Sequence, residues 1–262
     1  MKLKYISLLV IIFLGCTNLN AQLKLIPTPR EITIEDSYFI FNQEIKIVNK
    51  TTNDFYTQEI NQCLEQELNI KLSYSKNANT NFIEIAKINS HKELKKTLKN
   101  NELNIDFNLG QEGYILKITP EFIKIISKTN AGIYYGIQTL KQLITANRIK
   151  NSIPCLVIYD SPDFPIRAWQ DDISRGPIPT MDYLKKQIKK MSSYKLNYFT
   201  MYTEHVFKLK KHSDIAPEDG ITKEDIKELS DYAHKYHVTL IGNYQSFGHM
   251  EKTLAHPNYQ HL

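Results

Sequence analysis

Hydrophobic and polar positions follow one pattern in the first part of the chain and a different pattern in the last part. In the first part, apolar residues alternate with polar ones over residues 82–88, 114–119 and 122–127, which predicts three strands. Pro120 and Glu121 separate the last two runs, so these two strands are expected to form a hairpin.

Helical spacing of apolar residues occurs in the same part of the chain. Residues 54–68 carry an apolar face, and Asp54 stands where the N-cap of such a helix is expected. A second helix is predicted over residues 131–145. Strands mixed with helices predict an α+β domain over residues 22–159, which is an ordinary domain size.

From residue 160 onward, strands and helices alternate strictly. Strands are predicted over residues 166–173, 196–203 and 238–244, with a helical pattern in each interval between them. Because alternating strands and helices build parallel sheets, residues 160–262 are expected to form β/α units.

The two intervening helices carry clear start signals. Thr180 can cap the first helix, and Thr222 with Asp225 resembles a capping box at the start of the second. The residues expected on their inner faces are Leu184, Ile188 and Met191 in the first helix and Ile226, Leu229 and Ala233 in the second.

The composition is that of a globular protein with a substantial core. Hydrophobic residues make up 42% of the 262 residues. The 33 basic and 28 acidic residues give a net charge of +5 that is spread along the chain rather than gathered in a block. This distribution gives no indication of nucleic-acid binding.

The first 21 residues have the layout of a bacterial secretory signal. Lys2 and Lys4 precede a short apolar run, and Ala21 offers a small residue for cleavage. The run is too short to span a bilayer. Gly15 and Cys16 leave a second route open, a lipoprotein signal with a lipidated cysteine. Either route predicts export to the periplasm or the cell exterior, with membrane attachment only through Cys16.

Two cysteines remain once this leader is set aside. Cys63 and Cys155 both stand in apolar patterns, which predicts buried free thiols. An exported protein can also form a disulfide, provided that the two Cα atoms lie close enough.

Polar side chains gather directly after each predicted strand of the β/α units. Parallel strands bring their carboxyl ends to one edge, and barrels of this type place their active sites there. The residues concerned are Asp172, Arg175, Glu204, His205, Gln245 and His249.

Arg167, early in the first of these strands, has two interpretations. It can be a structural strand arginine paired with Asp171 or Asp172. It can also be a forked donor that binds two adjacent oxygen atoms of a ligand, a task that suits a guanidinium group. A lone histidine such as His249 is more often structural than catalytic.

Several histidines are available as metal ligands. They are His205, His234, His237, His249 and His256. No His-Glu-x-x-His motif and no paired-cysteine spacing occurs in the sequence, so neither a metal nor another cofactor is expected.

Several segments taken together resemble one family. FPIRAWQDDISRG, LNYFTMYTEH and NYQSFGHME resemble the first three barrel strands of the β-N-acetylhexosaminidases of glycoside hydrolase family 20. LIPTPREI, TNAGIYYGIQTLKQLI and DSPDFPIR resemble the preceding domain and its junction with the barrel. The resemblance implies an α+β domain followed by the first three units of a TIM (β/α)8 barrel, which is truncated over residues 160–262.

The resemblance also implies roles for particular residues. Arg167 would bind substrate, Glu204 and His249 would support the general acid, and Asp172 and Arg175 would lie near the site as structural residues. Two departures stand out. Ala168 replaces the usual Gly, and the second strand reads Tyr-Thr-Glu-His instead of ending in Asp-Asp, which is closer to a divergent hexosaminidase-D-like branch.

Members of the family remove terminal N-acetylglucosamine or N-acetylgalactosamine from glycans with an adjacent Asp-Glu pair that follows the fourth strand. We expect that pair beyond Leu262, because Asp171 and Asp172 face opposite ways in a strand and cannot replace it. One hypothesis is therefore a hexosaminidase chain that is inactive alone. The alternative is a noncatalytic glycan-binding or structural remnant.

Overall fold

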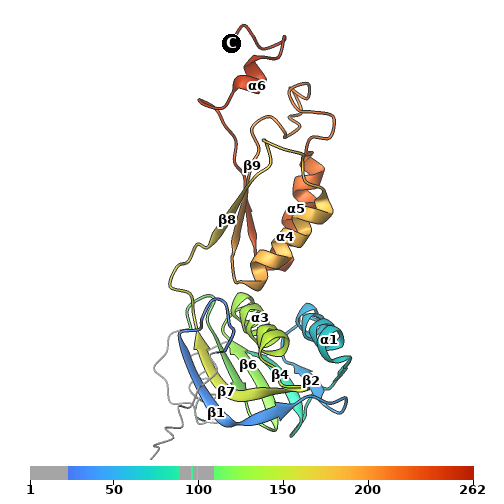
Figure 1. Cartoon of the computed structure of the whole chain (residues 1–262), viewed down its shortest axis with the longest axis vertical. Coiled ribbons are helices and arrows are strands. Elements are labelled where there is room, and N and C mark those ends of the chain that lie inside the picture. Colours follow the sequence, from blue (N-terminus) through green and yellow to red (C-terminus); the bar gives the residue numbers. More distant parts are fainter. Residues whose placement is uncertain (1–22, 89–95, 97–98, 100–108) are drawn as a thin grey trace, which may run out of the picture.

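A computed structural model describes residues 23–88, 96, 99 and 109–262 (Figure 1). The predicted leader lies outside the described residues. The chain forms two parts, called here the α+β domain (residues 23–160) and the β/α segment (residues 161–262). The predicted boundary at residues 159 and 160 stays a prediction.

The α+β domain is built on a seven-stranded mixed sheet with the strand order β1-β7-β5-β6-β4-β2-β3. The predicted hairpin is confirmed, because β5 and β6 pair antiparallel. The predicted strand at 82–88 is confirmed as β4. The strands are β1 (Glu31–Ile40), β2 (Lys46–Asn49), β3 (Ser73–Tyr74), β4 (Phe82–Lys87), β5 (Tyr114–Ile118), β6 (Phe122–Ser127) and β7 (Ser152–Asp160).

Two helices, α1 (Phe55–Leu68) and α3 (Asn130–Ala146), cover the sheet face that is turned toward the β/α segment (Figure 1). Gly132 lets α3 approach the sheet, since a Cβ atom there would lie 2.1 Å from Ser127 Oγ. Asp54 occupies the N-cap position of α1 as predicted, but its side chain makes no capping hydrogen bond.

The β/α segment is a parallel three-stranded sheet in the order β10-β9-β8 (Figure 1). This confirms the predicted alternation and parallel pairing. That these three strands begin a TIM barrel remains a prediction. The elements are β8 (Ala168–Asp172), α4 (Met181–Ser193), β9 (Tyr198–Tyr202), α5 (Lys223–Lys235), β10 (Thr239–Ile241) and α6 (Glu251–Leu254).

Both predicted helix starts are confirmed. The Thr180 hydroxyl accepts a hydrogen bond from the Tyr183 amide, and Thr222 forms a complete capping box with Asp225. The strands are shorter than predicted: β8 begins only after Pro165, which lacks an amide donor, and β10 ends before Gly242. Buried inner-face residues are Leu184, Ile188, Met191, Leu229 and Ala233, while Ile226 is partly buried.

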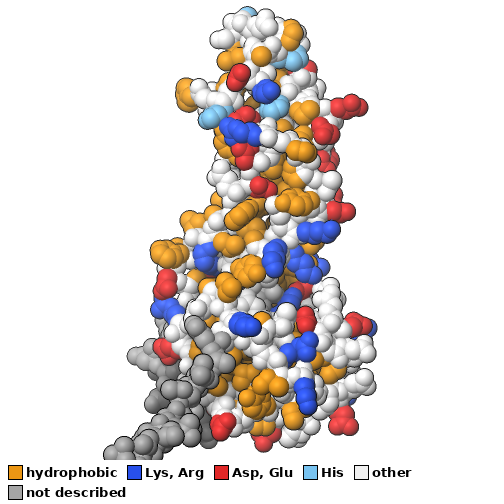
Figure 2. Space-filling view, viewed as in Figure 1, with side chains coloured by type: hydrophobic (Ala, Val, Ile, Leu, Met, Phe, Trp, Pro, Cys, Tyr) orange, Lys and Arg blue, Asp and Glu red, His pale blue; other side chains and the backbone are white. Residues whose placement is uncertain are grey.

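The outer strands of this small sheet are open to solvent. Trp169 on β8 and Ile241 on β10 are exposed, and Figure 2 shows hydrophobic side chains at the surface of the β/α segment. An apolar groove of about 470 Å³ lies between β10 and α5 and is lined by Met201, Leu240 and Ile226 among others.

Cys63 and Cys155 are buried free thiols, as predicted. Burial raises the pKa of both thiols, so neither is an activated nucleophile. Among the described residues, no helix combines the length and the apolar character needed to cross a bilayer.

Candidate functional site at the carboxyl ends of the parallel strands

Arg175 is the centre of a polar cluster at the carboxyl ends of β8, β9 and β10. One guanidinium nitrogen, Nη1, pairs with Asp172 Oδ2. The other, Nη2, donates a hydrogen bond to Glu204 Oε1 at 2.9 Å and lies 3.5 Å from His249 Nδ1. We call Asp172, Arg175, Glu204 and His249 the carboxyl-end cluster. The Arg175 guanidinium therefore links residues at the ends of three different strands.

Glu204 is the best-shielded member of the cluster. Its side chain is 11% exposed, against 55% for Arg175 and 59% for His249. The Glu204 amide donates to Gln245 Oε1 at 3.0 Å, and Gln245 in turn donates to Asn243 Oδ1 at 2.9 Å. The ends of β9 and β10 are thus tied together, which fixes where the carboxylate points.

The ring of Tyr202, the last residue of β9, packs against two members of the cluster. The Arg175 guanidinium lies 5.2 Å from the centre of the Tyr202 ring, and the His249 ring meets the same ring edge-on at 5.8 Å. Hydrogen bonds from Ser174 and then the charge of Arg175 hold the pKa of Asp172 below its ordinary value. At neutral pH the cluster therefore has an ionised Asp172 facing a fixed guanidinium.

The arrangement places a carboxylate beside an imidazole. Glu204 Oε1 lies 3.5 Å from His249 Nδ1, close enough to orient the ring. The four members of the carboxyl-end cluster, together with Gln245, meet as the order of strands predicted. His205 does not join them. Its Nδ1 atom is buried and has no hydrogen-bond partner among the described residues.

Arg167 lies at the other end of the sheet, just before β8. Its carbonyl oxygen accepts the amides of Asn197 and Tyr198 at the start of β9, so about five residues of strand, or roughly 16 Å, separate it from the carboxyl-end cluster. The structure does not bring Arg167 together with Glu204 or His249. Its predicted contact with substrate stays a prediction.

The guanidinium of Arg167 is occupied by protein partners. Nε donates to the Lys195 carbonyl and Nη1 to the Phe164 carbonyl, both at 2.7 Å. Nη2 pairs with Glu112 Oε2 at 2.7 Å. The suggested pairing with Asp171 or Asp172 is wrong, because Asp172 is held by Arg175 and Asp171 accepts from Gln187.

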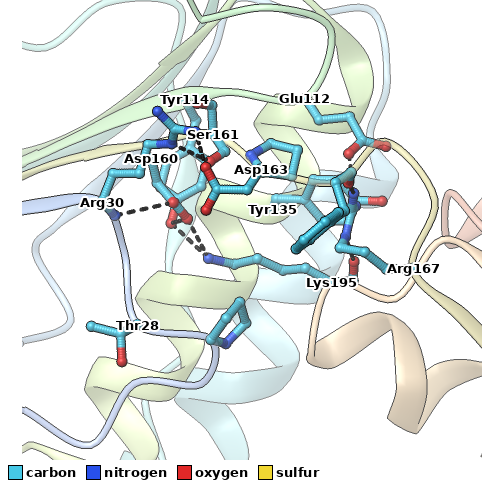
Figure 3. Close-up of a pocket in the computed structure, with 13 residues that line it drawn as sticks. Thr28, Arg30, Glu112, Tyr114, Tyr135, Asp160, Ser161, Asp163, Arg167 and Lys195 are labelled. Atoms are coloured by element: carbon cyan, nitrogen blue, oxygen red, sulfur yellow. Dashed lines mark hydrogen bonds and ion pairs between the residues drawn. The ribbon is translucent and has the colours of Figure 1, made fainter.

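Arg167 lines a second cavity, of about 170 Å³, between the two parts of the chain (Figure 3). In it, Lys195 Nζ lies 2.7 Å from Asp160 Oδ2 and 2.8 Å from the Tyr114 hydroxyl. Sequence reasoning missed Asp160, Lys195 and Glu112. Their partners are far apart along the chain, and no short motif links them.

No group of three or more His, Cys, Asp or Glu side chains in the described ranges is arranged to hold a metal ion. His237 is instead packed against Tyr56 and Tyr134 of the α+β domain.

Comparison with solved structures defines the class of fold. The chitobiase of Flavobacterium johnsoniae superposes with a TM-score of 0.71 over 89% of this chain and 36% of that chain, at 22% identity. A Streptomyces plicatus β-hexosaminidase gives a TM-score of 0.72 over 88% of this chain and 47% of that one, at 20% identity. At these identities, the likeness shows a shared fold.

The sequence comparison identifies the family. The family described as glycosyl hydrolase family 20, domain 2, matches residues 22–161. The chain therefore belongs to glycoside hydrolase family 20.

Curated relatives agree. The β-hexosaminidase of Porphyromonas gingivalis is 29% identical over 56% of this chain, and that of Akkermansia muciniphila is 30% identical over 58%. The matched regions cover 22% and 35% of those proteins, so the chain matches well under half of their length.

Proposed function

We propose that this chain supplies the N-terminal domain and the first three barrel units of an exo-β-N-acetylhexosaminidase. Its substrate would be a glycan that ends in N-acetylglucosamine or N-acetylgalactosamine. Family membership supports the reaction class. The observation that carries the proposal is the convergence of Asp172, Arg175 and Glu204 at the carboxyl ends of parallel strands, where barrels place their active sites.

In the proposed reaction, the acetamido oxygen of the substrate attacks the anomeric carbon in place of a protein nucleophile. An Asp orients the acetamido group, and an adjacent Glu with a raised pKa protonates the leaving oxygen. The resemblance assigns this pair to the end of a fourth strand. Within the described β/α segment, three strands are present.

Glu204 and His249 have a supporting role in this proposal. The Glu204 carboxylate is largely buried and held by Arg175, so it keeps its position when substrate enters. From there it orients the His249 imidazole, 3.5 Å away, toward the general acid. Arg175 and Asp172 keep this carboxylate in place and have no direct part in bond breaking.

The chain alone is accordingly expected to lack turnover, because it supplies the support for the acid but not the acid. Hydrolysis of an aryl N-acetyl-β-glucosaminide by the isolated chain tests this expectation, and we expect a rate equal to the buffer blank. Turnover that disappears in the Glu204→Gln variant would contradict it. Binding of N-acetylglucosamine oligomers without turnover, even after the barrel is completed, would favour the noncatalytic alternative.

The role of Glu204 can be tested in a chimera whose barrel is completed from the Akkermansia muciniphila relative. Glu204→Gln should lower kcat/KM at least about tenfold, because an amide cannot hold the histidine as a carboxylate does. Glu228→Gln is the matched control, since Glu228 also pairs with a cation, Lys185, but lies on the exposed side of α5. Equal activity of the two variants would refute the proposed role.

A further inference from the structure

The turns that follow α4 and α5 share an unusual feature. Lys195 and His237 each occupy the position just after the helix C-cap, with φ values of 63° and 57°. The hydrogen bonds are those of a Schellman motif: the Leu196 and Val238 amides reach back to carbonyls in the last helical turn, as do those of Lys195 and His237. Glycine normally takes this left-handed position, because any Cβ atom strains it.

Lys195 extends its side chain out of the β/α segment into the α+β domain (Figure 3). The residue is 6% exposed, and its ammonium group contacts Asp160 at the end of β7 and the Tyr114 hydroxyl of β5. The Tyr114 hydroxyl also donates to Asp160 and lies 2.6 Å from Thr139 Oγ1 on α3. A buried lysine held by a carboxylate and a phenol is a costly contact to break.

His237, in the turn between α5 and β10, also extends its side chain into the α+β domain. Its Nε2 atom lies 3.3 Å from the Tyr56 hydroxyl, which donates to the Asn130 carbonyl. The His237 ring is 5.1 Å from the Tyr134 ring. Both strained residues therefore contact the α+β domain through their side chains, although they come from different turns.

We propose that Lys195 and His237 are positioning residues that anchor the starts of β9 and β10 on the α+β domain. Each replaces the usual glycine, and its side-chain contacts hold the strained backbone in place. The strands that they precede span only Tyr198–Tyr202 and Thr239–Ile241, and their far ends lead to Glu204 and His249. Through these short strands the anchors fix the spacing of the carboxyl-end cluster. This anchoring is independent of the proposed glycosidase activity.

Two identical substitutions test the proposal on the full chain. Lys150 also has a left-handed backbone, with a φ of 55°, but it is an exposed turn residue, and its side chain forms no ion pair within the described ranges. Lys150→Gly should raise Tm by about 2–4 °C, because only strain is removed. Lys195→Gly should lower Tm by at least about 5 °C, because Asp160 loses its buried partner.

Amide hydrogen exchange distinguishes positioning from simple loss of stability. In Lys195→Gly, the Glu204 and Ile173 amides, at the far ends of β9 and β8, should exchange at least tenfold faster. The Ile85 amide on β4 should keep its wild-type rate, because β4 pairs with β2 and β6 and not with the strands that carry Tyr114 and Asp160. His237→Asn provides a milder variant, since asparagine tolerates the left-handed backbone but lacks the ring.

His237→Asn should lower Tm and accelerate exchange at Glu204 in the same way. A higher Tm in Lys195→Gly, equal to that of Lys150→Gly, would overturn the proposal, because strain would then outweigh anchoring. Wild-type exchange at Glu204 in both anchor variants would also overturn it. Should Lys195→Gly not fold, His237→Asn decides the outcome by the same two measurements.

Discussion

Acid should weaken the contact between the two parts of the chain through His237. Burial, and then the nearby charge of His234, lowers the pKa of His237 from 6.5 to about 4. The groups that face the ring are the Tyr56 hydroxyl from α1 and the Tyr134 ring from α3. Neither is an anion, and Tyr56 already donates to the Asn130 carbonyl, so an imidazolium ion gains little compensation there.

The sign of the effect follows from which state takes up the proton. Once His237 leaves its site its pKa returns to about 6.5, so the unfolded state binds a proton as the pH falls below that value, while the folded state remains neutral until about pH 4. The folded state is therefore destabilised across this window. The full effect is about 3 kcal/mol, of which about 2 kcal/mol is lost between pH 7 and pH 5.

Urea denaturation at pH 7, 6 and 5 measures this loss, with His237→Asn as the comparison. The wild-type free energy of unfolding should fall by about 2 kcal/mol, while that of the variant should change much less. The aspartates with lowered pKa values, Asp172, Asp214 and Asp225, lose their contributions only below about pH 4, outside this window. An equal pH dependence in wild type and variant would refute the reasoning.

Three further substitutions have defined expectations. Glu59→Gln should lower the free energy of unfolding, measured by urea denaturation, by about 2 kcal/mol. The Glu59 side chain is 4% exposed, and its partner Lys141, at 2.5 Å, has only partial access to water once the carboxylate is lost. Gly132→Ala should lower Tm by about 5 °C or more, since the new Cβ atom would meet Ser127 Oγ at 2.1 Å. Arg167→Lys should lower Tm through its lost protein contacts, whereas a substrate-binding role predicts a raised KM at unchanged Tm in a completed enzyme.

Local signals in the sequence were sufficient for much of the fold. The capping box of Thr222 and Asp225 and the apolar spacing of Leu184 and Ile188 are decided within one or two helical turns, so their outcome depends little on distant contacts. The carboxyl-end cluster was also predictable in outline, because parallel strands bring residues that follow them to a single edge.

Contacts between the two parts of the chain could not be predicted in this way. Glu112 pairs with Arg167 across 55 positions of sequence, and a nearby aspartate is the partner that local reasoning favours. Lys195 gives no sign of its left-handed backbone, because the residue expected there is glycine. Both depend on how the α+β domain packs against the β/α segment, which pattern alone does not specify.

The β/α segment places backbone strain at both ends of its strands. Within its described residues, the non-glycine positions with positive φ are Lys195 and His237 before β9 and β10, and Glu204 and His249 after them. Each such position costs about 1–2 kcal/mol and persists only where other contacts enforce it. Before the strands those contacts are made to the α+β domain, and after them to Arg175. Contacts made at the starts of β9 and β10 and contacts made after their ends therefore both hold the backbone in a left-handed geometry that it would not adopt without them.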